Sequence, residues 1–114
     1  MNVLSGISVF FDVDDTLISW NEDDNGTLIN TPLGMRKFKI FDDVVSAIKL
    51  HKLRGHNIIV WSAGGGEWAR TVVDSLGLTE YVDLCISKPS WFWDDSEASK
   101  ILPEENRRHS NKGS

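Results

Sequence analysis

The sequence has little of what stabilises secreted or membrane-spanning proteins. Its 114 residues include one cysteine, Cys85, which cannot form a disulfide within the chain. We therefore expect a reducing compartment, the cytoplasm. No apolar run approaches the roughly 18 residues that a transmembrane helix needs, and the N-terminus lacks the basic and apolar segments of a secretory signal. These absences predict no membrane partner.

Positive charge is also scarce. The chain has 12 Lys and Arg against 17 Asp and Glu, a formal net charge of −5, which argues against broad nucleic-acid affinity through charge alone. The charge does not exclude an enzyme that acts on nucleic-acid ends. With no repeat and no linker, the length predicts a single core domain over residues 1–102. A polar, disordered tail is predicted over 103–114, where the pair Arg107-Arg108 is more typical of a solvated tail than of a polyanion contact.

Short apolar runs alternate with helical patterns along the chain. Runs without polar alternation are typical of strands buried on both faces of a parallel sheet. The expected strands are at 6–12, 57–62, 81–87 and 91–93. The expected helices are at 42–54, 67–76 and 96–102. Asp42 is the expected N-cap of the first helix, and Gly55 is expected directly after its end.

One segment does not follow this alternation. Asn25-Gly26 is a strong turn signal between two short apolar runs, so we predict a hairpin flap over 18–30. Strands that alternate with helices indicate an α/β fold with a parallel sheet. The predicted architecture is a Rossmann-like three-layer sandwich, with a parallel sheet of four or five strands and a small β-hairpin flap.

Polar side chains follow every predicted strand at the point where it ends. They are Asp12 and Asp14, Ser62 with the glycine loop after it, Lys88, and Asp94 with Asp95. The carboxyl ends of parallel strands meet at one edge of the sheet, where ligands bind. Several carboxylates in one place repel each other unless a hard cation lies between them, and Mg²⁺ is the cation that takes such oxygen ligands together with water.

The same residue types can carry phosphoryl transfer. A carboxylate can attack phosphorus to form an aspartyl-phosphate, and a second carboxyl two residues later, at the spacing of Asp12 and Asp14, can act as general acid and base. Lys88 adds positive charge. The hydroxyl of Ser62 and the N–H groups of the loop after it can hold the phosphate.

The sequence resembles the haloacid dehalogenase (HAD) superfamily over roughly residues 6–96. The segment from Asp12 to Leu17, Asp-Val-Asp-Asp-Thr-Leu, is similar to the first motif of its phosphotransferases. Ser62 after Ile58-Ile59-Val60-Trp61 resembles the second motif, and Lys88 the third. Asp94-Asp95 after Trp91-Phe92-Trp93 is similar to the paired-acid form of the fourth.

The resemblance implies a role for each matching residue. Asp12 would be the nucleophile and a Mg²⁺ ligand, and Asp14 the general acid and base, with its backbone carbonyl on the metal. Thr16 would orient Asp14 and support the phosphate-binding loop. The phosphate would be held by Thr16, Ser62, Ala63, Gly64 and Lys88. Asp95 is the preferred further metal ligand, with Asp94 in support.

The spacing between the motifs leaves no room for the cap domain that many family members carry. The resemblance therefore implies a minimal, cap-less phosphatase with an open site. Such members often act on macromolecules, on phosphoproteins or nucleic-acid ends, or use a neighbouring subunit as a lid, so both a monomer and a homodimer are compatible. On the predicted flap, Trp20 is placed either to stack on a base or to pack within the hairpin.

We predict a Mg²⁺-dependent phosphatase that hydrolyses a phosphomonoester through an aspartyl-phosphate. The alternatives are a polynucleotide 3′-phosphatase and a non-catalytic phosphate-binding module of the same fold. Simpler interpretations exist for single residues: a solvated turn for Asp12 and Asp14, a surface position for Lys88, and a helix cap for Ser62. The interpretation of Asp15 is a solvated charge. We expect Trp61, Trp91 and Trp93 in the core and no metal on His51, His56 and His109.

Overall fold

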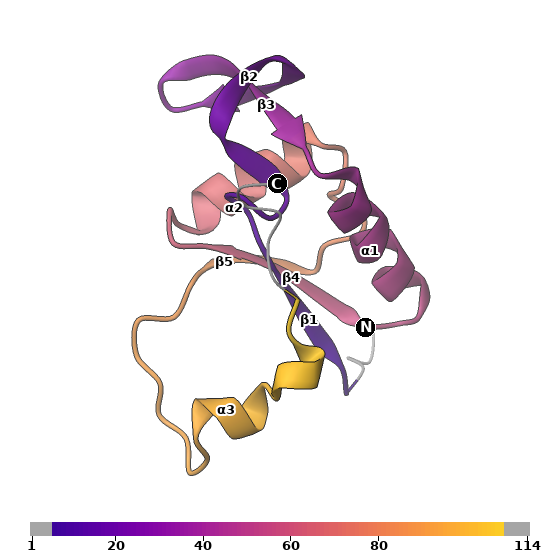
Figure 1. The fold of residues 1–114 in the computed structure, drawn as a ribbon, viewed down its shortest axis with the longest axis vertical. Coiled ribbons are helices and arrows are strands. Elements are labelled where there is room, and N and C mark those ends of the chain that lie inside the picture. The colour runs from indigo at the N-terminus through magenta and orange to yellow at the C-terminus, as the bar shows by residue number, and fades with distance from the viewer. Residues whose placement is uncertain (1–5, 109–114) are drawn as a thin grey trace.

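Three parallel strands form the main sheet of the protein, in the order β1-β4-β5 (Figure 1). The computed structural model describes residues 6–108. The strands are β1 (Ser8–Asp12), β4 (Asn57–Ser62) and β5 (Leu84–Ser87). The sequence prediction of a mixed α/β fold with a parallel sheet is confirmed, and the first two strands lie close to where their apolar runs place them.

Two helices connect these strands and cover one face of the sheet. They are α1 (Asp42–Leu53), which leads into β4, and α2 (Gly66–Ser75), which leads from β4 towards β5. Both crossovers step in the same direction along the sheet, so right-handed connections place both helices on the same side, as Figure 1 shows. The core lies between this face and the helices, and its fully buried members include Val13, Ile48, Ile58, Val60, Val72 and Val73.

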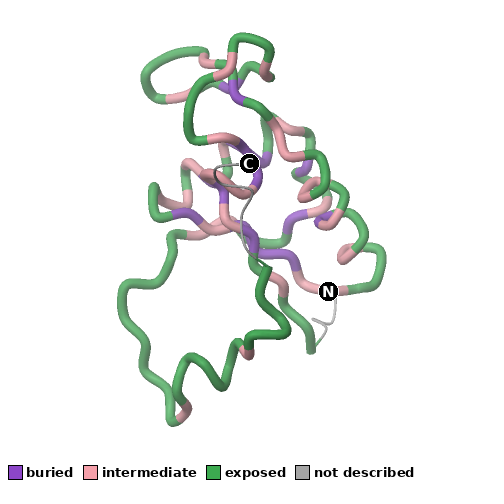
Figure 2. Tube along the Cα trace, in the orientation of Figure 1, coloured by how far each residue is buried: buried purple, intermediate pink, exposed green. Residues whose placement is uncertain are grey.

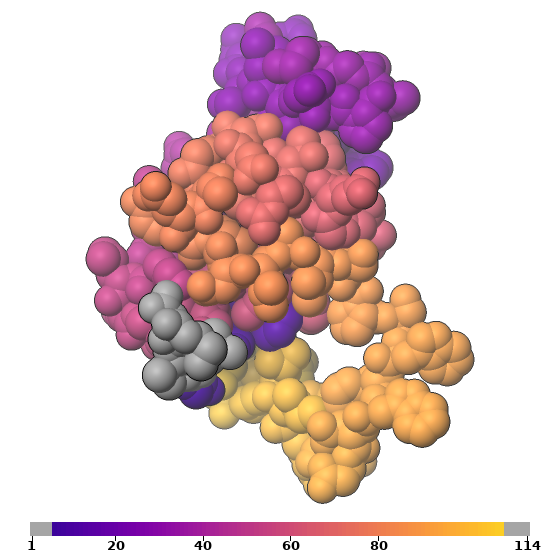
Figure 3. All heavy atoms as spheres, turned by 180° about the vertical axis from the view of Figure 1, so that it is seen from behind, coloured from indigo at the N-terminus to yellow at the C-terminus, as the bar shows by residue number. Residues whose placement is uncertain are grey.

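The predicted Rossmann-like three-layer sandwich with a sheet of four or five strands is wrong, because the sheet of the described residues has three strands and both α1 and α2 lie on one face of it. The described residues form three strands in the main sheet, and the run Trp91-Phe92-Trp93 forms none. Trp91 is 85% exposed and Trp93 is 93% exposed, so the expectation that they belong to the core is also wrong. Strands usually need about five residues and a paired neighbour. Here three apolar residues follow Pro89 without a partner strand, and the segment projects from the body of the molecule (Figure 3).

The hairpin between β1 and α1 is longer than predicted. It consists of β2 (Ile18–Thr31) and β3 (Gly34–Ile40), so it covers 18–40 rather than 18–30. Its turn is at Pro32-Leu33, where Gly34 takes a φ of +108°. Asn25-Gly26 lies instead inside β2, at an irregularity where both Glu22 and Thr27 pair with Phe38. A Cβ on Gly26 would collide with the backbone of Phe38, so this glycine serves a close strand approach and not the turn.

The hairpin contributes residues from both of its strands to the core. Ile18 and Ile29 are fully buried, and Phe38 is 8% exposed. Figure 2 shows these buried stretches within a hairpin that is otherwise mostly exposed. The Phe38 ring meets the indole of Trp68 on α2 edge-on, with 6.3 Å between ring centroids. The hairpin is therefore anchored against α2, and the two strands extend beyond the sheet from that contact (Figure 1).

The N-terminal end of α1 differs from the sequence prediction, and the C-terminal end agrees with it. Phe41 occupies the N-cap position and no side chain caps the helix, so Asp42 is the first helical residue and not the cap. Its carboxylate still lies at the end where the helix dipole favours negative charge. Gly55 has a φ of +81° directly after Arg54 and its N–H donates to the Lys52 carbonyl, as expected for a glycine that ends a helix.

The C-terminal part of the described chain contains two short helical elements, α3 (Ala98–Ile101) and the 3₁₀ turn η1 (Glu104–Asn106), neither with a buried residue. The predicted tail over 103–114 is described only to residue 108; the rest lies outside the described residues. No helix within residues 6–108 is both long and apolar enough to cross a membrane.

Candidate active site

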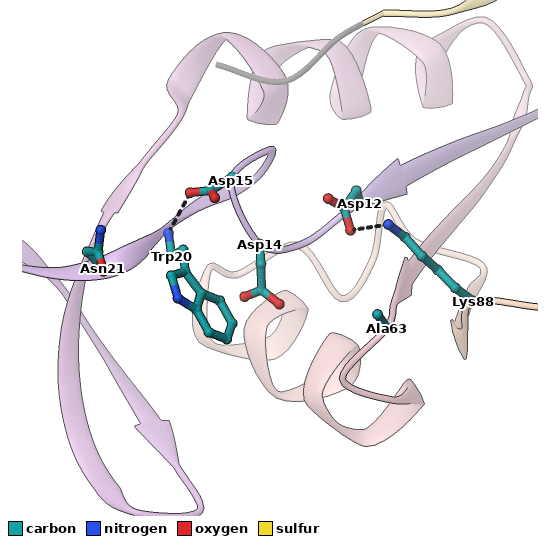
Figure 4. A pocket seen from close by; sticks show the side chains of 7 residues that line it. All are labelled: Asp12, Asp14, Asp15, Trp20, Asn21, Ala63 and Lys88. Atoms are coloured by element: carbon teal, nitrogen blue, oxygen red, sulfur yellow. Dashed lines mark hydrogen bonds and ion pairs between the residues drawn. The ribbon is translucent and has the colours of Figure 1, made fainter. Parts of the chain in front are cut away.

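An open pocket of about 600 Å³ lies at the carboxyl edge of the sheet (Figure 4). The residues that line it are Asp12, Asp14, Asp15, Trp20, Asn21, Ala63 and Lys88. Four of these seven are predicted site residues that come from three different segments: Asp12 at the end of β1 with Asp14 after it, Ala63 after β4 and Lys88 after β5. The prediction that these strand ends meet at one edge is confirmed for this group.

Asp12 is fixed through both of its carboxylate oxygens. Its Oδ1 lies 3.1 Å from the ammonium of Lys88, and its Oδ2 accepts a hydrogen bond of 3.2 Å from the hydroxyl of Thr16. The Lys88 backbone is held in turn, because its N–H donates to the Ser62 carbonyl at 3.0 Å. Asp12 is thus partly exposed at the pocket floor, charge-paired and oriented.

Thr16 supports a different acid from the one expected. The resemblance implies that it orients Asp14, but its hydroxyl bonds Asp12. Thr16 does not line the pocket in this structure. Its place follows from a tight turn after β1, in which the Val13 carbonyl accepts the N–H groups of Thr16, Leu17 and Ile18. This turn brings residue 16 back towards residue 12.

Asp14 lies deeper in the same wall. Its Oδ1 accepts a 3.2 Å hydrogen bond from the indole N–H of Trp68 on α2. Burial raises the pKa of the Asp14 carboxyl; the Trp68 hydrogen bond opposes this shift, and the charges of Asp12 and Asp15 add to it. Lys88 opposes the shift to a smaller extent. A carboxyl with a raised pKa suits a general acid, and a neighbouring carboxylate that is paired with a cation suits a nucleophile.

The loop after β4 is shaped by Ser62, although Ser62 does not itself line the pocket. Its side chain is fully buried, and its hydroxyl accepts the Gly64 N–H at 2.9 Å. Ser62 does not cap α2, whose N-cap is Gly65 with a φ of +109° and no side-chain capping hydrogen bond. Contact between the Ser62 hydroxyl and a phosphate stays a prediction. Of the predicted phosphate-binding residues in this loop, Ala63 lines the pocket and Gly64 does not.

Asp94 and Asp95 are not brought to the pocket in this structure. Both are exposed and lie in the segment between β5 and α3, outside the pocket lining. Asp94 accepts the N–H of Ser96 at 2.8 Å, and this hydrogen bond is the first cause that holds its carboxyl pKa below the usual range. The two acids therefore form a local turn of their own.

The residues of the pocket fit a magnesium ion that keeps most of its water ligands. Among residues 6–108, no three His, Cys, Asp or Glu side chains are placed to hold a metal by themselves. Asp12 and Asp14 nevertheless face one pocket with carboxylate oxygens. Mg²⁺ is usually bound by one or two carboxylates, with phosphate and water in the remaining positions. The donor set fits that mode and does not form a closed protein cage.

Three residues of this site were not found from the sequence. Helical spacing places Trp68 on the apolar side of α2, yet its indole N–H donates to Asp14. A Trp whose ring is partly buried needs a partner for that N–H, and this need is the signal in the sequence. Asp15 was interpreted as a solvated charge, but it has a φ of +63°, lines the pocket and accepts the Trp20 N–H at 2.8 Å. Asn21 carried no signal.

The chain matches no family model, and no curated protein matches it.

Proposed function

We propose that the protein is a Mg²⁺-dependent phosphatase that hydrolyses a phosphomonoester through an aspartyl-phosphate formed on Asp12. The observation that carries the proposal is the grouping of Asp12, Asp14 and Lys88 in one open pocket at the carboxyl edge of the sheet. The ordered resemblance of residues 6–96 to HAD phosphatases supports the same assignment.

The first step forms a bond between an Asp12 carboxylate oxygen and phosphorus. The bond between phosphorus and the ester oxygen breaks, and Asp14 gives its proton to that leaving oxygen. Lys88 stabilises the charge on the phosphoryl oxygens from the position where it now pairs with Asp12. The raised pKa of Asp14 favours this role, because a protonated carboxyl is needed at the start.

The second step restores the enzyme. Asp14, now a carboxylate, removes a proton from a water molecule, and the water oxygen attacks the phosphorus of the Asp12 aspartyl-phosphate. The bond between phosphorus and the Asp12 oxygen breaks, so inorganic phosphate leaves and both acids return to their starting states. Thr16 keeps the Asp12 carboxylate in one orientation throughout through its 3.2 Å hydrogen bond.

A bound Mg²⁺ would supply charge neutralisation between the phosphate and the two acids. Asp12 and Asp14 are the residues of the pocket that would hold it. The resemblance adds Asp95, with Asp94 in support, as further ligands. The structure places both outside the pocket lining, so their part in metal binding stays a prediction.

Asp12→Asn tests the nucleophile. The variant keeps the size and shape of the side chain but cannot form the aspartyl-phosphate, so we expect no hydrolysis of p-nitrophenyl phosphate and an unchanged circular dichroism spectrum. Asp24→Asn, at an exposed position outside the pocket, is the matched control. Activity of Asp12→Asn equal to that of the wild type would refute the assignment of Asp12 as the nucleophile. No hydrolysis of any phosphomonoester by the wild type would leave a non-catalytic phosphate-binding module.

Metal removal tests the cofactor. We expect EDTA to abolish hydrolysis and added Mg²⁺ to restore it. Asp95→Asn should raise the Mg²⁺ concentration needed for half-maximal activity more than Asp94→Asn does. If both variants behave as the wild type, the ligands are restricted to Asp12 and Asp14; full activity in EDTA would remove the metal from the mechanism.

A further inference from the structure

Trp20 is a large apolar side chain left uncovered at the wall of the candidate pocket. It is 65% exposed, lies at the start of β2, and lines the pocket next to Asn21. No aromatic ring of the described residues contacts it, and the ring that packs against α2 is Phe38, from the other strand of the hairpin. Packing within the hairpin therefore covers only the smaller part of this side chain.

The backbone of Trp20 is tied to the loop that carries the acids. Its N–H donates to the Asp15 carboxylate at 2.8 Å, and the Asp15 N–H donates to the Ile18 carbonyl at 2.7 Å. Ile18 is fully buried and forms a bridge with Asp14. The backbone of Trp20 is thus held in a fixed place relative to Asp12 and Asp14, which limits the backbone entropy lost when a ligand contacts its side chain.

The order of side chains along the pocket wall shows which part of a substrate would lie near Trp20. In Figure 4, Asp14 lies between the Trp20 indole on one side and the Asp12–Lys88 pair on the other. Under the proposed function, the phosphoryl group sits at Asp12 and Lys88, and Asp14 protonates the leaving oxygen. The leaving group then extends from Asp14 towards Trp20 and Asn21.

We propose, on the basis of the proposed function, that the substrate is a nucleoside monophosphate whose base stacks on Trp20. An exposed indole offers a flat face that any base can cover. Asn21, beside it in the pocket lining, has an amide that can both donate and accept a hydrogen bond, as the edge of a base requires. A plain phenyl ring would use Trp20 alone.

Charge favours a mononucleotide over a polynucleotide or a nucleoside triphosphate. The pocket lining contains three aspartates and one lysine, and the whole chain has a formal net charge of −5. Asp15 is the acid hydrogen-bonded to the Trp20 backbone, so it would repel a second phosphate beside the base. Lys88 is the only cation in the lining and is used by the phosphoryl group.

Substrate preference tests the proposal. We expect wild-type kcat/KM to be higher for adenosine monophosphate than for ribose 5-phosphate, phenyl phosphate or a 3′-phosphorylated oligonucleotide. In Trp20→Ala the ratio of adenosine monophosphate to ribose 5-phosphate should fall roughly tenfold, within the range for one base stacked on an aromatic side chain. Trp20→Phe should keep most of the ratio, and Trp93→Ala, 93% exposed and outside the pocket lining, should keep all of it.

Equal rates for adenosine monophosphate and ribose 5-phosphate in the wild type would overturn the proposal. An unchanged ratio in Trp20→Ala, or a preference for phenyl phosphate or the oligonucleotide, would overturn it as well. Asn21→Ala should lower kcat/KM for adenosine monophosphate more than for phenyl phosphate; equal losses would remove the nucleobase assignment.

A binding measurement separates this inference from the proposed function. In ¹⁵N-labelled protein, the indole resonance that is missing in Trp20→Phe should shift when adenosine monophosphate is added, and not when inorganic phosphate is added. A shift without hydrolysis of any ester would keep the nucleotide site and refute the phosphatase. Hydrolysis of p-nitrophenyl phosphate without the shift would keep the phosphatase and refute the nucleotide site.

Discussion

The indole N–H of Trp68 joins α2 to an acid that lies 54 residues earlier in the chain. A hydrogen bond to a carboxylate stabilises its charged form, so this contact works against the burial that raises the pKa of Asp14. Trp68 therefore positions Asp14 and limits how far its carboxyl departs from ordinary behaviour. The same ring is also in contact with Phe38, which ties the acid to the hairpin.

Trp68→Phe should raise the pKa of Asp14 further, because the phenyl ring fills most of the space but cannot donate a hydrogen bond. The measurement is a titration of the Asp14 carboxyl by ¹³C NMR, which does not depend on activity. Trp61→Phe is the control, since Trp61 contacts Phe10 on the sheet and makes no bond to Asp14. A pKa that stays the same or falls in Trp68→Phe would show that the hydrogen bond does not act on Asp14.

Two histidines without a shared motif in the sequence lie side by side at the end of α1. The Nδ1 atoms of His51 and His56 lie 2.9 Å apart, so one ring donates and the other accepts. Burial lowers the pKa of His51, and the neighbouring charges of His56 and Arg54 lower it further. If both rings carried a positive charge, neither Nδ1 could accept the hydrogen bond, and two positive charges would lie side by side.

Stability should therefore fall in mildly acidic solution. The pKa of His51 in the folded protein lies below the unfolded value of about 6.5, so the unfolded chain takes up the proton first. The stabilisation is complete above about pH 6.5 and is lost as the pH falls towards the folded value. Urea unfolding at pH 8 and pH 5.5 should show this loss, and His51→Gln should reduce it. An equal loss in the variant would assign the effect to other groups.

Gly26 decides how the two strands of the hairpin meet. At this position β2 approaches the backbone of Phe38 so closely that a Cβ has no room. Phe38 also pairs with residues on both sides of the irregularity, Glu22 and Thr27. The glycine thus permits four residues to loop out of an otherwise continuous pairing, which keeps Phe38 over Trp68 and Trp20 near the pocket.

Gly26→Ala should destabilise the protein by about 1–3 kcal/mol, the usual cost of forcing extra atoms into a filled space. Urea unfolding followed by circular dichroism measures it. Gly6→Ala is the matched control, because nothing lies within 4 Å of the Cβ that it would add. If the two variants unfold at the same urea concentration, the strand approach at Gly26 is not a constraint on the fold.

The carboxylate of Asp83 connects three elements of the fold near the N-terminal end of β4. The Asp83 carboxylate accepts the Ile58 N–H at 2.7 Å and pairs with the Lys52 ammonium at 2.7 Å. Burial raises the pKa of Asp83, but the hydrogen bonds from Ile58 and Lys52 outweigh it and hold the pKa below its usual range. Asp83 therefore links the end of α1 to β4 and to the chain that enters β5.

Across the whole molecule, the body and the segment after β5 differ in burial. The sheet, both long helices and the base of the hairpin share one core, whereas Trp91, Phe92 and Trp93 are 85%, 55% and 93% exposed. Side chains so exposed contribute little to the free energy of unfolding. The two aspartates that follow them are exposed as well and stay away from the pocket lining.

Trp91→Ala and Trp93→Ala should each change the free energy of unfolding by less than about 0.5 kcal/mol, as substitutions at exposed positions do. Ile58→Ala, at a fully buried position, is the positive control and should cost about 2–5 kcal/mol. Thermal or urea unfolding of the three variants measures the difference. A loss of more than about 2 kcal/mol in either tryptophan variant would mean that its side chain is buried against the body of the protein.

Local patterns along the chain were sufficient for the elements whose burial depends on near neighbours. The apolar runs predicted β1 and β4, the helical spacing predicted α1 and α2, and the order of strands and helices predicted a parallel sheet. From that topology alone it followed that Asp12, Asp14 and Lys88 meet, because parallel strands end at one edge. None of these conclusions needs a distance between remote side chains.

Contacts between remote segments decided the rest. A turn signal at Asn25-Gly26 looks the same whether the glycine turns the chain or admits a neighbouring backbone, and only the position of Phe38 distinguishes the two. The run at 91–93 has the composition of a strand, but a strand exists only where its hydrogen-bonding groups find a partner. Likewise, the Trp68 bond to Asp14 depends on where α2 packs, which spacing along the chain does not encode.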